Sequence, residues 1–201
     1  MRRVPAGALT AAGVCLLVFG ATAPPSAVPD TPRDLGRPPA AAPSAVPGQG
    51  AGEVPRRFAL PGRAAVPVLP VGAGADGALR PPEAADGLGW WEGGARPGAA
   101  RGTVLVAGHV DDRAGNPGAF AALAGMAPGD EVRVTAADGR DHTYRITARR
   151  TYAWDGLPDD LFDASGPHRL ALITCTGTYD REAGRYTRNL VLYGELVRRP
   201  G

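Results

Sequence analysis

Short apolar runs, some alternating with polar residues, recur along the chain from about residue 57 onward. Residues 131–135 alternate between polar and apolar side chains, and the alternation resumes over residues 142–147. Asp138-Gly139 lies between these two alternating runs and is a strong turn signal, so residues 131–147 are predicted to be a β-hairpin. Further strands are predicted over residues 103–108, 169–174 and 189–197.

Residues 66–71 also have the pattern of a strand, but prolines interrupt it at positions 67 and 70. Because proline cannot donate to a strand ladder, this strand is expected at a sheet edge or a bend. Only residues 118–125 have the pattern of a helix, and they span barely two turns. Many short strands joined by Gly/Pro turns predict a mainly β domain, either a closed barrel or a sandwich.

The first 23 residues follow a different pattern. Two arginines precede an uncharged stretch at residues 4–23, which is about long enough to span a bilayer as a helix. These arginines predict the N-terminus inside and the rest of the chain outside the cell membrane. Ala21-Thr22-Ala23 has the small residues of a cleavage site, whereas Pro24 disfavours cleavage. A single N-terminal anchor is therefore favoured, and secretion after signal cleavage is the alternative.

The rest of the chain divides into two parts. Residues 24–56 are rich in Pro, Ala and Gly, with almost no large apolar side chain, and are predicted to be a disordered tether. Residues 57–201 have the length of a typical single domain. The expected organisation is an anchor or signal segment (1–23), a tether (24–56) and a folded domain (57–201).

Charge and motifs exclude several function classes. The folded part carries 17 basic and 17 acidic residues, and this balance argues against a nucleic-acid partner. Every basic residue is arginine, so the chain has no lysine for amine catalysis. No metal-ligand spacing and no Gly-rich phosphate loop are present, so neither a metal nor a cofactor is expected.

Three side chains at strand ends suggest acyl-transfer chemistry. Cys175, the one cysteine beyond the N-terminal stretch, ends the run at 169–174; His109 follows the run at 103–108, and Arg188 precedes the run at 189–197. The thiolate is the nucleophilic form of cysteine, and a nearby cation raises the fraction of the thiol that is ionised. Arginine offers several donors to an oxyanion, and histidine can protonate a leaving amine. Together the three are sufficient for acyl transfer through a thioester.

Each residue also has a structural interpretation. Cys175 alone could be a small buried hydrophobe, His109 a hydrogen-bonded structural residue and Arg188 a surface charge. Asp111 and Asp112 could orient the imidazole or bind a cation, but turn residues are the favoured interpretation. The long loop 153–168, with Trp154, Pro158 and Phe162, could wall a groove.

At these residues the chain resembles the sortases, the cysteine transpeptidases of Gram-positive surfaces. The sequence Ala-Leu-Ile-Thr-Cys ending at Cys175 is similar to the family's Thr-Leu-x-Thr-Cys signature, with Ala for the first Thr. Ala-Gly-His ending at His109 resembles the segment of the catalytic His, and Arg188 opens a strand similar to that of the family's Arg. Gly-His-Val-Asp and Thr-Cys-Thr-Gly are most similar to the actinobacterial class F, with class E second.

The resemblance implies a closed antiparallel eight-stranded β-barrel with one or two short helices. It implies that Cys175 attacks the Thr–Gly carbonyl of a sorting signal similar to Leu-Pro-x-Thr-Gly. Arg188, favoured over Arg185 by the register at Asn189, would hold the substrate and the oxyanion, and His109 would protonate the leaving amine. An amine of a cell-wall precursor, or water, would resolve the thioester. The implied partners are sorting-signal peptides of surface proteins, the precursor amine and, through the N-terminal segment, the membrane.

Two other functions remain possible from the sequence. One is a non-catalytic exported β-domain that acts as a wall-associated binding module. The other is the L,D-transpeptidase class, whose motif runs Gly-Cys, then an aliphatic residue and Arg; Thr174-Cys175-Thr176-Gly177 does not match it.

Overall fold

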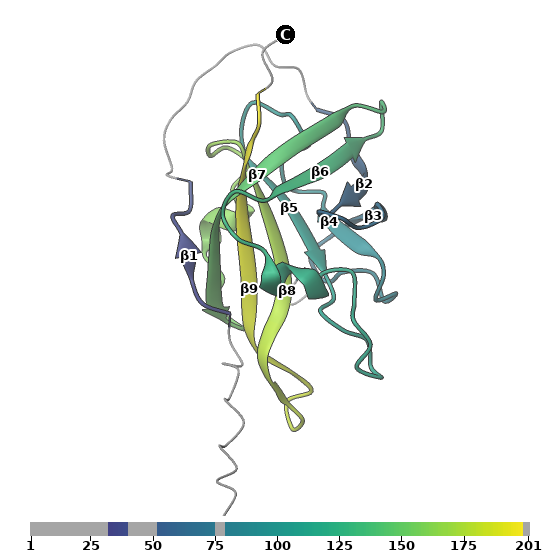
Figure 1. The fold of residues 1–201 in the computed structure, drawn as a ribbon, viewed down its shortest axis with the longest axis vertical. Coiled ribbons are helices and arrows are strands. Elements are labelled where there is room, and N and C mark those ends of the chain that lie inside the picture. The colour runs from purple at the N-terminus through teal and green to yellow at the C-terminus, as the bar shows by residue number, and fades with distance from the viewer. Residues whose placement is uncertain (1–31, 40–51, 75–78, 199–201) are drawn as a thin grey trace, which may run out of the picture.

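The computed structural model describes residues 32–39, 52–74 and 79–198 (Figure 1). The predicted anchor or signal segment and most of the predicted tether lie outside these residues. No helix in the described ranges is long and apolar enough to cross a membrane.

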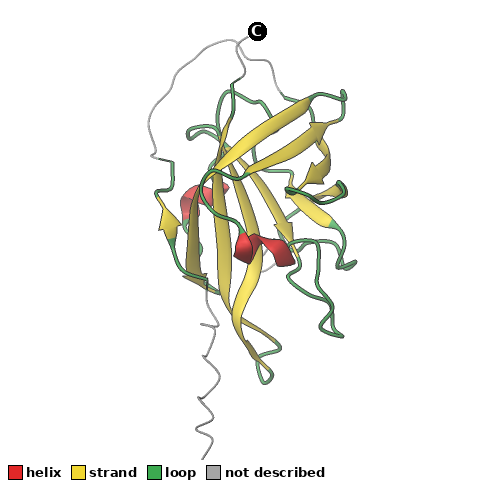
Figure 2. Cartoon of the chain, viewed as in Figure 1, coloured by secondary structure: helices red, strands yellow, loops and turns green. Residues whose placement is uncertain are grey.

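Eight strands form a closed ring of hydrogen-bonded neighbours (Figure 2). Their order around the ring is β7-β6-β2-β3-β4-β5-β8-β9, and the pairing of β9 with β7 closes it. The predicted closed eight-stranded barrel is therefore confirmed, and the sandwich is excluded. The strands are β2 (Pro55–Ala59), β3 (Val66–Val71), β4 (Leu88–Trp91), β5 (Thr103–Gly108), β6 (Glu131–Ala136), β7 (Asp141–Ala153), β8 (Arg169–Asp180) and β9 (Arg185–Leu196).

The barrel is not antiparallel throughout. β3 and β4 pair in parallel, as do β5 and β8, whereas the other neighbours are antiparallel. Parallel neighbours need a long crossover connection, and the chain provides one in each case. Residues 72–87 join β3 to β4, and the whole β6–β7 hairpin lies between β5 and β8. The parallel pairing of β5 with β8 brings the C-terminal end of β5 beside the middle of β8, at Thr174.

β3 is not an edge strand, although its prolines suggested one. At Val66 and Pro67 it pairs with β2, and over residues 68–71 it pairs with β4. The strand therefore changes partner along its length. Each proline therefore pairs with only one neighbouring strand, which explains how the ring tolerates two residues without a backbone N–H.

The helices are short, as expected from the sequence. The described residues contain two, both 3₁₀ helices: η1 (Ala121–Gly125) and η2 (Asp159–Phe162), drawn red in Figure 2. η1 begins later than the predicted helix over residues 118–125. Before η1, the backbone N–H groups of Gly118, Ala119 and Phe120 donate to the carbonyls of Val110, Ala85 and His109, which attach this segment to its neighbours.

Apolar residues fill the barrel and also cover part of its outside. The interior cluster takes side chains from all eight strands, as a barrel interior must, and includes Phe58, Leu88 and Leu172. A second cluster, with Ile173 and Leu161 among its members, lies under the loop between β7 and β8. Burial on both faces explains why β5 and the first half of β8 are continuous apolar runs rather than alternating ones.

Two pieces of the predicted disordered tether at residues 24–56 are ordered in the structure, and one of them is the start of β2 at Pro55. Residues 35 and 36 form a short strand, β1 (Leu35–Gly36), that pairs with β7. Arg149 donates to the carbonyl of Arg33, and Arg150 donates to those of Leu35 and Gly36. These hydrogen bonds from arginine side chains to backbone carbonyls order the segment. A Pro/Ala-rich composition does not predict them. The boundaries 1–23, 24–56 and 57–201 otherwise remain predictions.

Candidate active site

Cys175 lies where β8 leaves the core. The preceding residues 169–174 are buried, whereas the free thiol of Cys175 is exposed. The buried hydroxyl of Thr174 donates to the carbonyl of Gly108 over 2.8 Å, which fixes the ends of β8 and β5 to each other. Exposure of the thiol rules out the interpretation of Cys175 as a buried hydrophobe.

His109 follows β5 as Cys175 follows the buried part of β8. The parallel register runs to Ala107 opposite Ile173, and the Thr174–Gly108 bond extends it by one residue. His109 and Cys175 are the next residues on these neighbouring strands. His109 is half-buried, and its Nε2 lies 2.9 Å from the carbonyl oxygen of Pro82. Since a carbonyl oxygen only accepts, this contact requires a proton on Nε2.

A glycine directly before His109 is required by packing. A Cβ atom on Gly108 would lie 2.5 Å from Leu88 Cδ2 and 2.8 Å from Phe120 Cδ2. Such distances do not occur between packed carbon atoms. Gly108 therefore lets the strand end sit against the core side chains, and His109 follows from that fixed position.

Arg188 lies on β9 beside the cysteine strand. Asn189 is directly opposite Cys175, and Arg188 is opposite Thr176. The register shifts between Thr176 and Tyr179, which is a β-bulge.

Gly177 lies in this bulge with φ +82°, a value that favours glycine. A Cβ atom there would lie 2.8 Å from Thr187 Oγ1 and 3.4 Å from Arg188 Cβ. The bulge thus sets the stem of Arg188 against Gly177. Bulges of this kind redirect a side chain that regular pleating would send to the other face of the sheet.

The two arginines nearest the cysteine differ in what they contact. The Arg185 guanidinium lies 3.9 Å from the centroid of the Trp154 ring, in cation–π geometry. The Arg188 side chain is exposed and has no hydrogen bond or ion pair with any described residue. Arg185 is therefore occupied by the β7–β8 loop, whereas the charge of Arg188 is available to a ligand.

The two aspartates after His109 have separate roles. Asp112 accepts 2.8 Å hydrogen bonds from the N–H groups of Ala114 and Asn116, so it is a turn residue, as expected. Asp111 accepts a short hydrogen bond from the Tyr186 hydroxyl. Among the described residues neither carboxylate bonds the His109 imidazole. The Asp111–Tyr186 bond instead joins the segment after His109 to the strand that carries Arg188.

The thiol is surrounded by groups that disfavour its ionised form. Burial raises the pKa of Cys175, and the negative charge of Asp111 raises it further. The side chain is thus exposed to reagents yet crowded by protein atoms. The hydrogen bond to Asp111 raises the pKa of Tyr186 to about 12, so this hydroxyl stays protonated as a donor. At neutral pH these effects keep the free thiol mostly neutral.

Asp111→Asn should lower the pKa of the Cys175 thiol, because the substitution removes a negative charge that opposes thiolate formation. The rate of alkylation by iodoacetamide, followed against pH, should rise at lower pH than in the unmodified protein. Glu182→Gln, which neutralises an exposed carboxylate of the β8–β9 turn, should leave the profile in place. An unchanged or upward-shifted profile for Asp111→Asn contradicts the assigned charge effect.

The loop between β7 and β8 packs against the outer face of the barrel. The Phe162 ring meets the Trp91 ring edge-on at 5.3 Å between centroids, and Leu161 is fully buried in the outer cluster. Asn189 Nδ2 donates to the Trp154 carbonyl at the start of the loop. At its end, Arg169 lies 3.1 Å from the carboxylate of Asp160. The loop is held at both ends beside the cysteine strand.

Sequence reasoning located where the buried runs of β5 and β8 stop, but Cys175 and Arg188 lie within β8 and β9 rather than at strand ends, because β8 continues to Asp180 and β9 begins at Arg185. It also missed several contacts around these residues. Tyr186 and Gly177 were not singled out, although Thr-Gly directly after a strand cysteine is a signal for a bulge. In the part of the chain that the structure describes, no cluster of three His, Cys, Asp or Glu side chains is placed to hold a metal ion.

Comparisons with known proteins show what the chain is similar to. Residues 62–197 match the family model described as "Sortase domain". Sortase A from Corynebacterium diphtheriae has a similar structure, with a TM-score of 0.55 and 19% identity over 73% of this chain and 62% of that one. Sortase C-1 from Actinomyces oris has a TM-score of 0.55 and 20% identity, over 71% of this chain and 73% of that one. Sortase C1 from Streptococcus agalactiae has a TM-score of 0.54 and 21% identity, over 74% of this chain and 69% of that one.

These matches differ in what they establish. The structural neighbours share the fold at low identity, and the chain spans 62% of the length of the Corynebacterium protein. A search of curated proteins finds no match. The family model, in contrast, covers more than half of the chain, including His109, Cys175 and Arg188.

Proposed function

The chain belongs to the sortase family, and we propose that it is a cysteine transpeptidase in which Cys175, His109 and Arg188 carry the reaction. The observation that supports this most is the junction of β5 and β8. There the Thr174–Gly108 hydrogen bond sets an exposed free thiol on the strand next to the one that ends in a histidine.

In the first step the Cys175 thiolate attacks the carbonyl carbon of a Thr–Gly bond, with His109 taking the thiol proton. The negative charge that develops on the carbonyl oxygen needs positive donors, and the unpaired Arg188 guanidinium can supply them. The C–N bond then breaks, His109 gives its proton to the leaving glycine amine, and the acyl group stays on sulfur as a thioester.

In the second step an amine attacks the thioester carbon. The amine loses a proton to His109, the C–S bond breaks and Cys175 is released as thiolate. Water in place of the amine gives hydrolysis. Attachment to a cell-wall precursor amine and hydrolysis therefore compete for the same thioester.

A sorting signal similar to Leu-Pro-x-Thr-Gly is the proposed acyl donor. Apolar side chains surround the outer cluster beside Cys175 and are only partly buried, so they can contact a Leu-Pro segment; they are Leu79, Trp91, Leu157 and Phe162. The loop between β7 and β8 is the proposed wall of this groove. The motifs around His109 and Cys175 favour class F, with class E second.

The proposed location follows from the N-terminal sequence. An anchor at residues 4–23 would hold the catalytic domain outside the cell membrane, where sorting signals and wall precursors meet. Cleavage after residue 23 would release the domain instead.

Peptide cleavage tests the proposed function. The protein should cut a Leu-Pro-Ala-Thr-Gly peptide between Thr and Gly and, with an added amine, form the amide product, both resolved by mass spectrometry. A stem peptide containing diaminopimelate is the contrasting donor, and cross-linking of that peptide alone would favour the L,D-transpeptidase class. Inertness toward both peptides, with a folded protein, would favour the non-catalytic binding module.

A further inference from the structure

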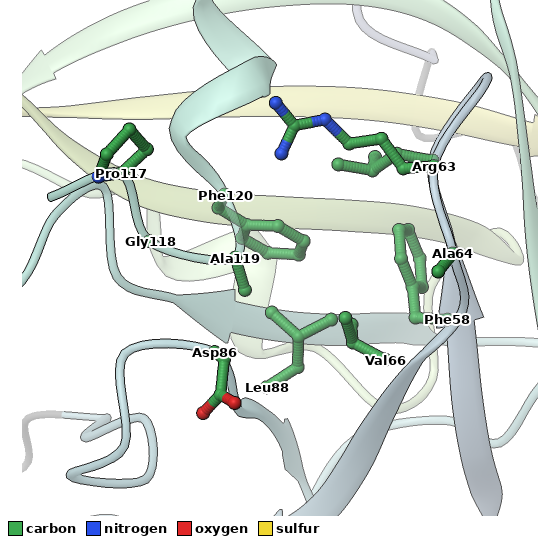
Figure 3. A pocket seen from close by; sticks show the side chains of 11 residues that line it. Phe58, Arg63, Ala64, Val66, Asp86, Leu88, Pro117, Gly118, Ala119 and Phe120 are labelled. Carbon is green, nitrogen blue, oxygen red and sulfur yellow. The ribbon is translucent and has the colours of Figure 1, made fainter.

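A cavity is lined in part by Phe120, whose backbone N–H donates to the carbonyl of His109 (Figure 3). It has a volume of about 360 Å³ and lies between the β2–β3 turn, the segment before β4 and the segment before η1. Its walls are largely apolar, with Phe58, Val66, Leu88 and Phe120 among the lining residues. We refer to it as the His-side cavity.

Two opposite charges line the His-side cavity at different places. Arg63 comes from the β2–β3 turn and Asp86 from the segment before β4, and Figure 3 shows them on opposite sides of the apolar side chains. Within the described residues, neither side chain forms an ion pair or a hydrogen bond. A ligand that carries a cation and an anion at the two ends of an apolar part would match this arrangement.

The wall of the cavity is bonded to the backbone of His109. Phe120 N–H donates to the His109 carbonyl over 3.0 Å, and Gly118 N–H donates to the Val110 carbonyl over 2.9 Å. Ala119 N–H donates to the Ala85 carbonyl over 2.8 Å, next to Asp86. A ligand in the cavity therefore contacts the same short segment that holds the imidazole.

The strand order determines what such a ligand reaches first. Around the barrel the strands run β8, β5, β4, β3, β2, so His109 at the end of β5 lies between Cys175 on β8 and the cavity over β4, β3 and β2. An amine arriving from the cavity meets His109 before the thioester on Cys175. A general base must lie within hydrogen-bond reach of the proton that it takes.

We propose that the His-side cavity binds the amine-bearing acceptor, a short peptide with an apolar side chain and a free carboxylate. This inference rests on the proposed transpeptidase function. Asp86, on the segment bonded next to His109, attracts the amino end, and Arg63 attracts the carboxylate. The ammonium first loses one proton to solvent. The neutral amine nitrogen then bonds to the acyl carbon, a second proton passes to His109, the C–S bond breaks and the electron pair stays on Cys175.

The test measures how one thioester divides between two products. With a Leu-Pro-Ala-Thr-Gly peptide as donor and glycylleucine as acceptor, the ratio of amide product to hydrolysed product is independent of how fast the thioester forms. Arg63→Gln should lower this ratio about fivefold to tenfold at subsaturating glycylleucine, as expected for loss of one charge-assisted contact. Ala64→Trp, which adds bulk at the cavity lining, should lower it as well.

Two matched comparisons make the test specific. Glycylleucine amide lacks the carboxylate, so Arg63→Gln should not change the ratio measured with it. Arg113→Gln removes an exposed arginine that does not line the cavity and should not change the ratio with either acceptor.

The outcomes separate the two proposals. If the thioester forms but the ratio is the same in Arg63→Gln, Ala64→Trp and the unmodified protein, or if glycylleucine is never an acceptor, the acceptor assignment is wrong while the transpeptidase proposal stands. If no thioester forms, the transpeptidase proposal itself fails. In that case glycylleucine binding is followed by NMR in the unmodified protein. Unchanged chemical shifts at Gly118 and Phe120 would overturn the cavity assignment too. Changed shifts there would show that the cavity binds the peptide without catalysis.

Discussion

Replacing Cys175 with alanine should reduce cleavage of a Leu-Pro-Ala-Thr-Gly peptide by at least about a thousandfold, because no other group in the proposed site can form a thioester. The chain offers no substitute nucleophile of the same kind, since its only other cysteine is Cys15 in the N-terminal stretch. Peptide cleavage followed by chromatography measures the effect. Cleavage at the unmodified rate in Cys175→Ala would rule out the proposed mechanism.

The same substitution should leave the fold intact. The Cys175 side chain is exposed, and the adjacent Thr174–Gly108 bond that joins β8 to β5 does not involve it. Exposed substitutions of this kind change the free energy of unfolding by about 0.5 kcal/mol or less. The thermal unfolding midpoint of Cys175→Ala therefore provides the control: a large drop would mean that lost activity reflects lost structure.

Arg188→Ala should lower kcat/KM for the same peptide by about a hundredfold to a thousandfold, which is the usual cost of removing one oxyanion donor. Unlike Arg185, Arg188 has a guanidinium with no partner among the described residues, and the β-bulge at Gly177 sets its stem beside the cysteine strand. The loss should appear mainly in kcat if the contact strengthens in the transition state. Steady-state kinetics over a range of peptide concentrations separates the two parameters.

Arg185→Ala is the matched control, three residues away on the same strand. It removes the cation–π contact with Trp154, worth about 0.5–1 kcal/mol at an exposed site, and should change kcat/KM far less than Arg188→Ala. The opposite ranking, with Arg185→Ala the more damaged variant, would assign the oxyanion role to Arg185 instead.

The sequence predicted most of the barrel because its strands have strong local signals. The continuous apolar runs of β5 and β8 are buried on both faces, and the Asp138-Gly139 turn gives the β6–β7 hairpin, with Gly139 at φ +81°. Local patterns also located the end of β5, which His109 follows, and the end of the buried part of β8, which Cys175 follows, although β8 itself continues to Asp180. What they could not give was strand order, and so the parallel pairing of β5 with β8 was not anticipated.

The errors have a common origin in long-range contacts. β3 was expected at an edge or a bend because its prolines were judged by a local rule; it is not at an edge, and it changes partner from β2 to β4 along its length. The ordered part of the tether depends on hydrogen bonds from arginines more than a hundred residues later. The Asp111–Tyr186 bond likewise joins residues 75 positions apart in sequence. No local pattern contains such information.

Barrel closure is what connects these observations to the proposed chemistry. Pairing of β8 with β5 on one side and β9 on the other brings the segments of His109, Cys175 and Arg188 to one region, although up to 79 positions separate them. The Asp111–Tyr186 bond then ties the segment after His109 to β9. A rigid strand framework of this type suits a site whose parts must keep fixed positions.

The most direct test of the proposed thioester is the intact mass of the protein after brief reaction with a Leu-Pro-Ala-Thr-Gly peptide and acid quenching. A covalent acyl-enzyme on Cys175 predicts a mass increase equal to the peptide portion before the Thr–Gly bond, less one water. Proteolytic mapping should find it on the fragment that contains Cys175. A turnover-competent protein with no such adduct, or with the adduct on another residue, would contradict the account.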